Sequence, residues 1–289
     1  MAMNTDKIQN KFSLSYFNLM TSLLAVLNSN EDDDTNLVLA RYLLEHFHEL
    51  KNLSIYDVAE ECYVSRSSIQ RFAKLIGYES FTAMKQNAPI TRQHMDAFVQ
   101  YACHPEFDQF LRISMDDMMQ DINEMFLAQN LDVLVKRIHD SEQVVILAAD
   151  LSSYPAKVLQ QGLAAIGKLI RIVTDAYPDT ALLQNLKPED LVIVTSTTGN
   201  YAIATLSGLQ SVHTCKVLIT LNHSEKFESC YDSVIYLSHK FHSSDRITEG
   251  IQNVYTRYGV SYFFDLLFNL YIEKVNTLPS SHPHSILIK

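Results

Sequence analysis

Glycine and cysteine are both scarce in this chain. Glycine supplies 7 of 289 residues, about 2% against a usual share of ~7%. Few positions can therefore adopt a left-handed backbone without strain. The cysteines show no metal-type spacing: Cys62, Cys103, Cys215 and Cys230. We expect reduced thiols in the core, and neither a metal site nor a cofactor.

Long uninterrupted apolar runs are also missing. The two richest stretches, at residues 14–27 and 260–272, are broken by Ser, Asn, Thr or Asp, so neither is a clean membrane span. The first residues, MAMNTDKIQNKF, show no signal-peptide pattern. We therefore expect a cytoplasmic protein with no membrane partner. A length of 289 residues with 47% hydrophobic and 19% charged residues predicts two core-forming domains.

Residues 54–77 have the pattern of two short helices joined by a tight turn. Ser54 and Asp57 fit a capping box at the start of the first helix, and Ser65 fits the cap of the second. Apolar residues then recur at helical spacing in both segments. They are Ile55, Val58, Ala59 and Cys62 in the first, and Ile69, Phe72, Ala73 and Ile76 in the second. Gly77 can end the second helix in the left-handed conformation.

The outer face of the second helix carries side chains suited to DNA. It presents Ser65, Arg66, Ser67, Ser68, Gln70, Arg71 and Lys74. Arginine can bind guanine or phosphate, Gln70 can pair with adenine, and serines can contact either base or phosphate. The alternative is a solvated face in a small helical bundle, since short helix pairs are common.

The charge of the chain is unevenly distributed. The net charge is −10, yet residues 51–92 hold six Lys or Arg against four acidic residues. Acidic residues gather elsewhere, as at 31–34. Because the local field governs the encounter with phosphate, the acidic total does not exclude DNA.

This segment resembles the N-terminal helix-turn-helix domain of the RpiR/MurR family of bacterial transcriptional regulators. The matching positions are Leu53-Ser54, Val58-Ala59, Val64-Ser65, Ile69, Arg71-Phe72, Leu75, Gly77-Tyr78, Phe81 and Lys85. The family pattern S-x-x-T-I-x-R-F corresponds to residues 65–72, with serine in place of threonine. Tyr63 stands where a small residue is usual, and a φ above zero there would strain it. The resemblance implies a regulator of carbohydrate-metabolism genes bound to a double-stranded, palindromic operator.

The rest of the first 129 residues also has helical patterns. We expect helices at 12–27 and 36–48 that complete an all-α domain at residues 1–87. Asn87-Ala88-Pro89-Ile90 is expected to break the pattern. Residues 88–129 then form a Met-rich helical linker that packs loosely, with a role in dimer contact. We expect a flexible tail at 276–289, where His282 and His284 flank a proline.

Residues 130–275 alternate between strand and helix patterns. We expect strands at 143–148, 169–173, 191–195, 216–220 and 233–237. We expect helices at 155–166, 179–185, 200–211 and 251–273. Runs such as Val144-Val145-Ile146-Leu147 fit strands buried on both faces, so the pattern predicts a three-layer α/β domain with a parallel sheet.

Two loops at predicted strand ends are candidates for ligand binding. The first follows the first strand and contains Asp150 and Ser152. The second leads into a helix and contains Ser196, Thr198, Gly199, Asn200 and Tyr201. A hydroxyl-rich turn at a helix N-terminus can bind an anion, but hydroxyl residues also cap helices in ordinary turns.

Residues 133–272 resemble the SIS (sugar isomerase) domain that the same family carries as a sensor. Ala156, Leu163, Ile166, Gly167 and Lys168 fit its first helix, and Thr256-Arg257 and Asp265-Leu266-Leu267 fit its closing helix. The family's S-x-S-G-x-T loop corresponds to residues 196–201, and its G-x-G-x-S loop to residues 148–152. The resemblance implies a phosphorylated sugar or related metabolite as effector, and a homodimer or homotetramer.

Three departures from the SIS pattern concern the effector. Both glycines of the first loop are absent, Asp150 replaces one of them, and Tyr201 replaces the threonine. A carboxylate about 5 Å from bound phosphate would cost roughly 3 kcal/mol per unit of ligand charge at an effective dielectric constant near 20. Three explanations stay open: Asp150 turns away, it binds sugar hydroxyls, or the domain no longer binds a phosphosugar tightly.

Three functions follow from these expectations. The first is a regulator whose α/β domain senses a phosphorylated metabolite. The second keeps the regulator but makes this domain a degenerate dimerisation scaffold. The third is a sugar-phosphate isomerase with Glu249 as general base, although an acid at a helix start is also favoured by the helix dipole. The helix-turn-helix pattern favours a regulator over an enzyme.

Overall fold

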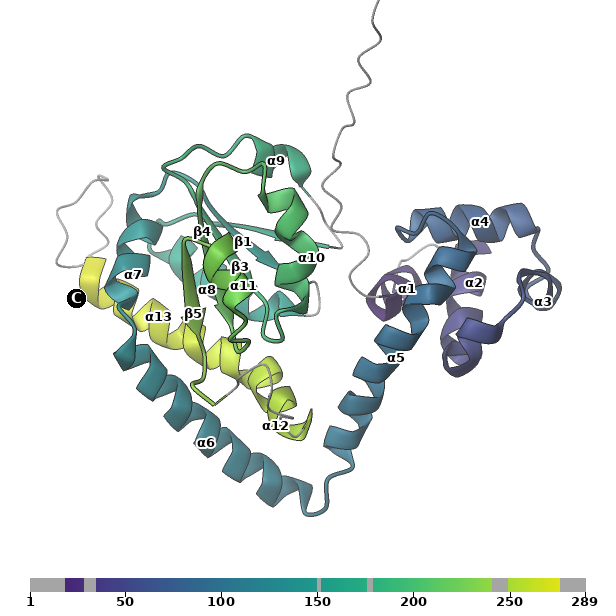
Figure 1. Ribbon diagram of the computed structural model, residues 1–289, viewed down its shortest axis with the longest axis horizontal. Coiled ribbons are helices and arrows are strands. Elements are labelled where there is room, and N and C mark those ends of the chain that lie inside the picture. The colour runs from purple at the N-terminus through teal and green to yellow at the C-terminus, as the bar shows by residue number, and fades with distance from the viewer. Residues whose placement is uncertain (1–18, 29–34, 150–151, 176–178, 241–248, 276–289) are drawn as a thin grey trace, which may run out of the picture.

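The computed structural model describes residues 19–28, 35–149, 152–175, 179–240 and 249–275 (Figure 1). A helical domain and an α/β domain lie at opposite ends of the molecule, joined by two long helices (Figure 1). This arrangement confirms the predicted fold class.

The helical domain packs short helices around one apolar core. Its elements are α1 (Leu19–Leu27), α2 (Thr35–Glu45), the 3-10 helix η1 (Phe47–Asn52), α3 (Ile55–Glu61), α4 (Arg66–Leu75) and the first half of α5 (Phe81–Ala102). Leu23, Leu43, Phe72 and Met84 are fully or almost fully buried there. The part of the expected first helix before residue 19 and the acidic run at 31–34 lie outside the described residues.

The predicted break at residues 87–90 is wrong, because α5 continues through Pro89 to Ala102. Proline removes one helical hydrogen bond and costs about 3 kcal/mol inside a helix. Met84, Ala88 and Thr91 are buried on either side of it. Burial of Met84 offsets much of this cost, since a fully buried large apolar side chain stabilises by about 1.5–3 kcal/mol.

The α/β domain contains a five-stranded parallel sheet in the order β2-β1-β3-β4-β5. The strands are β1 (Val144–Ala148), β2 (Arg171–Thr174), β3 (Leu191–Thr195), β4 (Cys215–Thr220) and β5 (Ser233–Tyr236). All four strand pairs are parallel. Every residue of β1 and β3 is buried, which confirms the prediction of strands covered on both faces.

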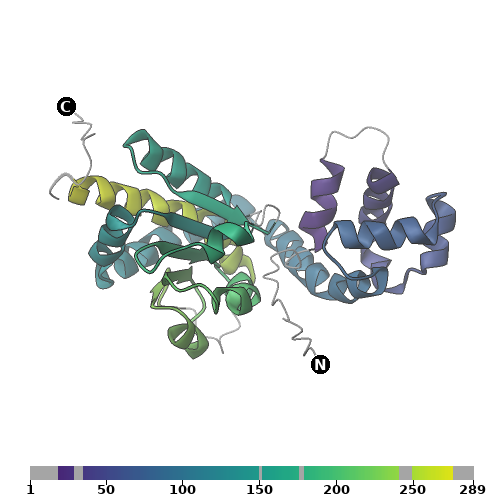
Figure 2. The same cartoon turned by 90° about the horizontal axis from the view of Figure 1, so that it is seen from above.

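Helices cover both faces of this sheet (Figure 2). One layer holds α6 (Phe107–Ala128), α7 (Leu131–Asp140), α8 (Tyr154–Ala165), α12 (Glu249–Val254) and α13 (Val260–Val275). The other holds α9 (Thr180–Gln184), α10 (Asn200–Leu209) and α11 (Glu225–Cys230). Val144 and Ile146 face the first layer, whereas Val145 and Leu147 face the second. This alternation follows from the two-residue period of a strand.

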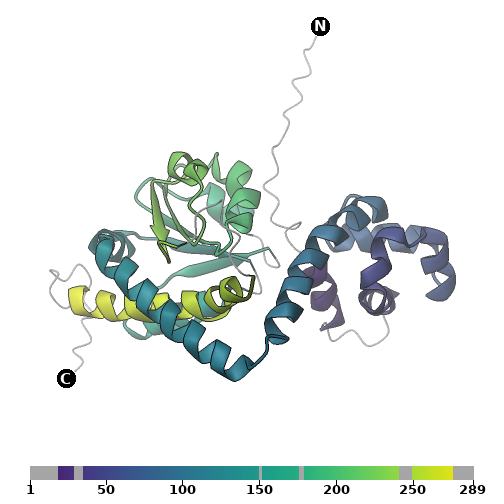
Figure 3. The same ribbon diagram turned by 60° about the horizontal axis from the view of Figure 1, so that its bottom comes forward.

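Helix α6 belongs to the α/β domain as well as to the connection. Met118 and Ile122 are buried in the core of that domain, so the Met-rich segment is more than the loosely packed linker expected. Figure 3 shows α6 running along the α/β domain, with α5 leading away from its start. A π-helical turn, Tyr255–Gly259, lies between α12 and α13.

The cysteines only partly follow the expectation of core thiols. Cys62 is buried and Cys215 half-buried, but Cys103 and Cys230 are exposed. All four are free thiols. His282, His284 and the expected tail lie outside the described residues.

No described helix combines the length and the hydropathy that a bilayer crossing requires.

Candidate functional site

Helices α3 and α4 form the predicted pair, and each begins at the predicted cap. The Ser54 hydroxyl accepts a hydrogen bond from the N–H of Tyr56, and the Ser65 hydroxyl accepts one from the N–H of Ser68. Gly77 has φ +95°, and the N–H of Tyr78 donates to the carbonyl of Ala73 at 2.8 Å. This is the Schellman-type ending that a glycine at this position predicts.

Tyr63 occupies the turn with a left-handed backbone. Its φ is +54° and its side chain is 96% exposed. The N–H of Val64 donates to the carbonyl of Ala59 at 3.0 Å, which closes α3 at this point. The strain foreseen for a tyrosine here is therefore present, at about 1–2 kcal/mol. An almost fully exposed ring provides little packing to offset it.

The outer face of α4 is exposed over most of the predicted residues. Ser65, Arg66, Ser67, Arg71 and Lys74 are exposed, whereas Ser68 is half-buried. The hydroxyls of Ser65, Ser67 and Ser68 lie within 2.9 Å of their neighbours, and Arg71 Nη2 donates to Ser68 Oγ at 3.2 Å. The start of α4 is thus a connected polar surface at the end of the molecule away from the α/β domain (Figure 1).

Gln70 does not present the free amide that the helical pattern predicted. Its side chain is half-buried, and Gln70 Oε1 accepts a hydrogen bond from the N–H of Phe81 at 3.0 Å. This contact helps to cap α5 beside Ser80, whose hydroxyl accepts from the N–H of Ala83. Paired contact with adenine uses the amide oxygen as well as the nitrogen, so adenine would have to share this oxygen with the N–H of Phe81 or displace that bond.

A contact that sequence reasoning missed joins α3 to α4. Arg66 Nη1 donates to Tyr56 Oη at 3.0 Å, and its guanidinium carbon lies 4.9 Å from the centre of the Tyr56 ring. Beside this pair, Ile55, Ser65, Arg66, Ser67 and Gln70 line an open hollow of about 490 Å³. An exposed tyrosine ten residues before an arginine gives no sequence signal for such a contact.

In the α/β domain, the two predicted ligand loops start from neighbouring strands. Ala148 and Thr195, the last residues of β1 and β3, are register partners. The chain leaves β1 toward β2 on one side and continues from β3 toward β4 and β5 on the other. The loops therefore flank the point where the strand order reverses, where ligands bind in open parallel sheets.

The second loop is held by its own hydroxyls. Ser196 Oγ accepts a hydrogen bond from the N–H of Ala202 at 3.1 Å, and Thr198 Oγ1 accepts one from the N–H of Asn200 at 3.3 Å. Ser196 is buried, Thr198 half-buried and Asn200 exposed. These contacts are the ordinary helix caps weighed against an anion site in the sequence.

Gly199 is required by geometry. Its φ is +84°, and a Cβ atom there would lie 2.8 Å from Asn222 Nδ2 and 2.9 Å from Phe227 Cζ. Asn222 Nδ2 in turn donates to the carbonyl of Thr198 at 2.9 Å. The loop after β4 thus fixes the loop after β3, and Asn222 is a member of this site that the sequence did not indicate.

The structure does not support Tyr201 as an accessible ligand contact. Only 2% of its side chain is exposed, and it packs in the core with Val145 and Leu147. Burial, followed by the charge of Asp175, raises the pKa of its phenol. Its position on the sheet-facing side of α10 explains the burial. Ser152 is half-buried, and Asp150 lies outside the described residues.

A buried carboxylate lies where the loop after β5 meets α6 and the π-helical turn. Asp121 Oδ2 accepts hydrogen bonds from Tyr255 Oη at 2.6 Å and from Ser238 Oγ, and Asp121 Oδ1 lies 2.7 Å from His239 Nδ1. Asp121, Glu124 and His239 lie close enough to share a metal ion. Two hydroxyl donors satisfy Asp121 Oδ2, whereas Oδ1 has the ion-pair contact with His239 and accepts no hydrogen bond among the described residues. Glu249 begins α12, and its side chain is outside the described residues.

The π-helical turn also holds the end of α5. The guanidinium carbon of Arg257 lies 3.9 Å from the ring centre of Phe98 and 4.7 Å from that of Tyr101. Asn253 Nδ2 donates to the carbonyl of Ala97 at 3.4 Å. The helix that leaves the helical domain is therefore fastened to the α/β domain by cation–π contacts and a hydrogen bond.

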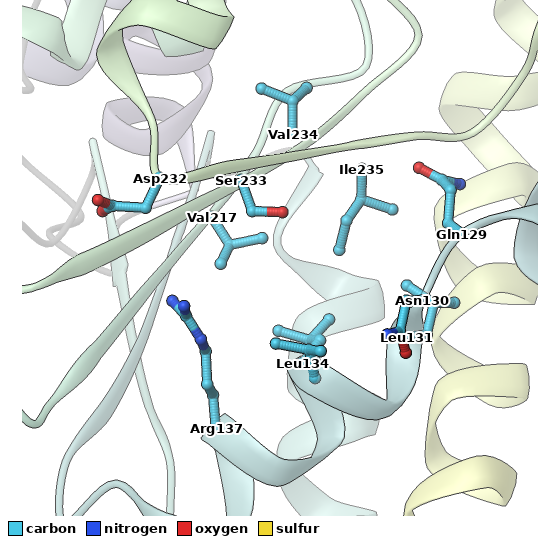
Figure 4. A pocket seen from close by; sticks show the side chains of 11 residues that line it. Gln129, Asn130, Leu131, Leu134, Arg137, Val217, Asp232, Ser233, Val234 and Ile235 are labelled. Atoms are coloured by element: carbon cyan, nitrogen blue, oxygen red, sulfur yellow. The ribbon is translucent and has the colours of Figure 1, made fainter.

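A separate cavity of about 380 Å³ lies between α7 and the first half of β5 (Figure 4). Arg137, Asp232 and Gln129 are among its polar lining residues. Its strand residues precede the carboxyl ends of β4 and β5, so it is apart from the loops at the strand-order reversal. Gln129 bonds both the N–H and the carbonyl of Tyr236, which protects this edge of the sheet.

These features define a helix-turn-helix protein with an attached α/β domain. Residues 18–88 match the model of the helix-turn-helix domain of the rpiR family.

Two similar proteins are named as HTH-type transcriptional regulators. YfhH of Escherichia coli K12, an uncharacterised HTH-type transcriptional regulator, is 26% identical over 176 residues, or 56% of this chain and 60% of that protein. The HTH-type transcriptional regulator GlvR of Bacillus subtilis is 22% identical over 171 residues, or 58% of this chain and 62% of that protein. The chain thus spans about three fifths of the length of these relatives.

The solved structure of Vibrio vulnificus NanR complexed with ManNAc-6P is also similar. It is 19% identical, with a TM-score of 0.46, and the alignment covers 90% of this chain and 94% of that one.

The strain at Tyr63 gives a stability prediction. Tyr63→Gly should raise the free energy of unfolding by about 0.5–1 kcal/mol, because relief of left-handed strain exceeds the entropic cost of glycine. Tyr63→Ala removes the same ring but keeps the strain, so it should give no gain. Urea denaturation measures both variants. Equal free energies of unfolding for Tyr63→Gly and Tyr63→Ala would show that the turn is not strained.

Proposed function

We propose that this protein is a sequence-specific, DNA-binding transcription regulator of carbohydrate-metabolism genes. The observation that carries the proposal is the exposed Ser/Arg/Lys face of α4, held at the outer end of a helix-turn-helix domain. Its N-terminal residues are free to meet base edges, while Arg71 and Lys74 suit phosphate contacts. The protein would act in the cytoplasm, where chromosomal DNA is found.

Two copies of the chain would read a palindromic operator. A dimer, or a tetramer built from dimers, would set two α4 helices on half-sites roughly 34 Å apart. A change in the packing of the α/β domains would alter that spacing. A ligand that favours one packing would therefore change DNA affinity, and DNA would change ligand affinity by the same factor.

The phosphate contacts can be tested through salt dependence. Arg71→Ala and Lys74→Ala should each reduce the slope of log affinity against log salt by about 0.9, because one fewer counterion is released. Fluorescence anisotropy on a random duplex, titrated at several salt concentrations, measures the slope. Lys157→Ala removes an equal charge from exposed α8 in the other domain and serves as control. A slope that follows the total charge, with all three variants alike, would argue against contact by α4.

We propose a small phosphorylated sugar as effector, bound beside Thr198 and Asn200 at the N-terminus of α10. Three features support this site: its place at the strand-order reversal, the hydroxyls of two adjacent loops, and the backbone of Gly199. Ser152 of the neighbouring loop would contribute a further hydroxyl. A phosphate would have to compete with the Thr198 cap, so binding would rearrange this loop.

The scaffold is the second candidate, and specific contacts favour it. Ser196 and Thr198 already cap α10, and Tyr201 is turned into the core. The isomerase is the third. In that case Glu249 would have to reach the sugar, and turnover of a substrate would be detectable.

A thermal-shift panel separates these three candidates. We expect one member of a set of hexose and pentose phosphates to raise the melting temperature, since ligand at 100 times its dissociation constant adds about 2.7 kcal/mol. Thr198→Ala should abolish that shift and leave DNA binding intact. Chromatography of the incubated sugar then shows whether it was converted. A panel without any shift favours the scaffold, and conversion of the sugar favours the enzyme.

We propose that the contact between Arg257 and α5 connects the two halves of the regulator. Each cation–π contact contributes about 0.5 kcal/mol where it is exposed and about 2 kcal/mol where it is buried. Arg257→Gln should therefore speed amide hydrogen exchange near residues 95–102 by about fivefold for each 1 kcal/mol lost. Arg112→Gln, on the exposed side of α6, is the matched control. Unchanged exchange in Arg257→Gln would mean that other contacts hold α5.

A further inference from the structure

The contact between Arg66 and Tyr56 bears on how the proposed regulator reads sequence. Arg66 is the first residue of α4, the position at which a recognition helix meets base edges. It is exposed, and it borders the open hollow between α3 and α4. The guanidinium therefore faces solvent at the place where DNA would approach.

Tyr56 holds this arginine in two ways. Its hydroxyl oxygen accepts from Arg66 Nη1 at 3.0 Å, and its ring lies 4.9 Å from the guanidinium carbon. Tyr56 is itself 63% exposed, whereas Val58 is the buried residue of α3. The ring thus contributes to a surface contact more than to the core.

The donors and acceptors of the pair leave room for DNA. A guanidinium has five N–H groups, and the tyrosine uses one of them. The remaining N–H groups include the two needed for paired contact with guanine O6 and N7. The tyrosine oxygen acts as acceptor, so its own O–H is available to donate to a phosphate oxygen.

We propose that Tyr56 is a positioning residue that presents Arg66 to a guanine in each operator half-site. This inference rests on the proposed DNA-binding function. It adds that guanine is the base recognised by Arg66, and that Tyr56 holds Arg66 in place before DNA binds. An arginine without a support would lose side-chain freedom on binding. Tyr56 restricts that freedom before DNA arrives, so it should affect one base position and not the whole affinity.

The test is selection of binding sites from a randomised duplex library by the full-length protein, followed by sequencing. We expect a guanine preference at one position of each half-site. Arg66→Lys should remove it, because an ammonium cannot make the paired contact. Tyr56→Leu should weaken the preference for the same guanine by about three- to tenfold, the scale of one immobilised side chain. Tyr56→Phe keeps the ring beneath the guanidinium and should retain part of the preference.

Two comparisons separate positioning from a merely structural role. Tyr63→Leu changes the other exposed tyrosine of the motif, which is 96% exposed, and should leave the selected sequence unchanged. The double variant Tyr56→Leu/Arg66→Lys should be no worse than Arg66→Lys alone, because both act on one contact. Melting curves of each variant check that the domain is folded.

Several outcomes would overturn the inference. One is a Tyr56→Leu variant that keeps the full guanine preference, or that loses affinity equally at every position. Another is an additive double variant. If the wild-type protein selects no sequence at all, the proposed function fails together with the inference. The outcomes named for Tyr56→Leu and for the double variant would reject only the role of Tyr56.

Discussion

Helix α5 is shared by both halves of this protein, and their relation depends on it. Its first half supplies Phe81, Met84 and Ala88 to the core of the helical domain. Its last turns carry Phe98 and Tyr101, which lie against Arg257 of the α/β domain. A helix that enters both cores transmits a rotation at one end to the other, provided that it stays unbroken. In the proposed function, coupling of the two halves would require α5 to continue unbroken through Pro89, as it does here.

The opposite end of that connection lies near the carboxyl edge of the sheet. The loop after β5 contacts the buried carboxylate of Asp121 through Ser238 and His239, and Tyr255 of the π-helical turn contacts the same carboxylate. Only one residue, Thr256, lies between Tyr255 and Arg257. A buried, hydrogen-bonded carboxylate is costly to leave unpaired, so these elements are expected to move together. π-Helical turns are frequent at functional sites, which agrees with this placement.

The proposed effector site and the proposed DNA surface differ in whether their binding groups are already available to a ligand. On α4 the serines and Arg66 are already ordered by contacts with neighbouring side chains. In the α/β domain, the helix N–H groups that would bind an anion are satisfied by Ser196 and Thr198. A ligand there would replace one set of hydrogen bonds by another, so net affinity would depend on contacts beyond the phosphate. The chain has few glycines, so side chains occupy positions in these loops where a glycine would leave the backbone open to a ligand.

Local patterns in the sequence were sufficient for the strands and for the caps of α3 and α4. Strand β3 follows from a run of buried apolar residues, the start of α4 from Ser65, and its end from Gly77, because each of these depends on nearest neighbours in the chain. Tertiary contacts decided the rest. Packing around Met84 and Thr91 kept α5 helical through Pro89, against its local preference. The cap of α5 engaged Gln70, and the sheet buried Tyr201. Which partner a polar or aromatic side chain finds is set by residues distant in sequence, and only the folded chain brings them together.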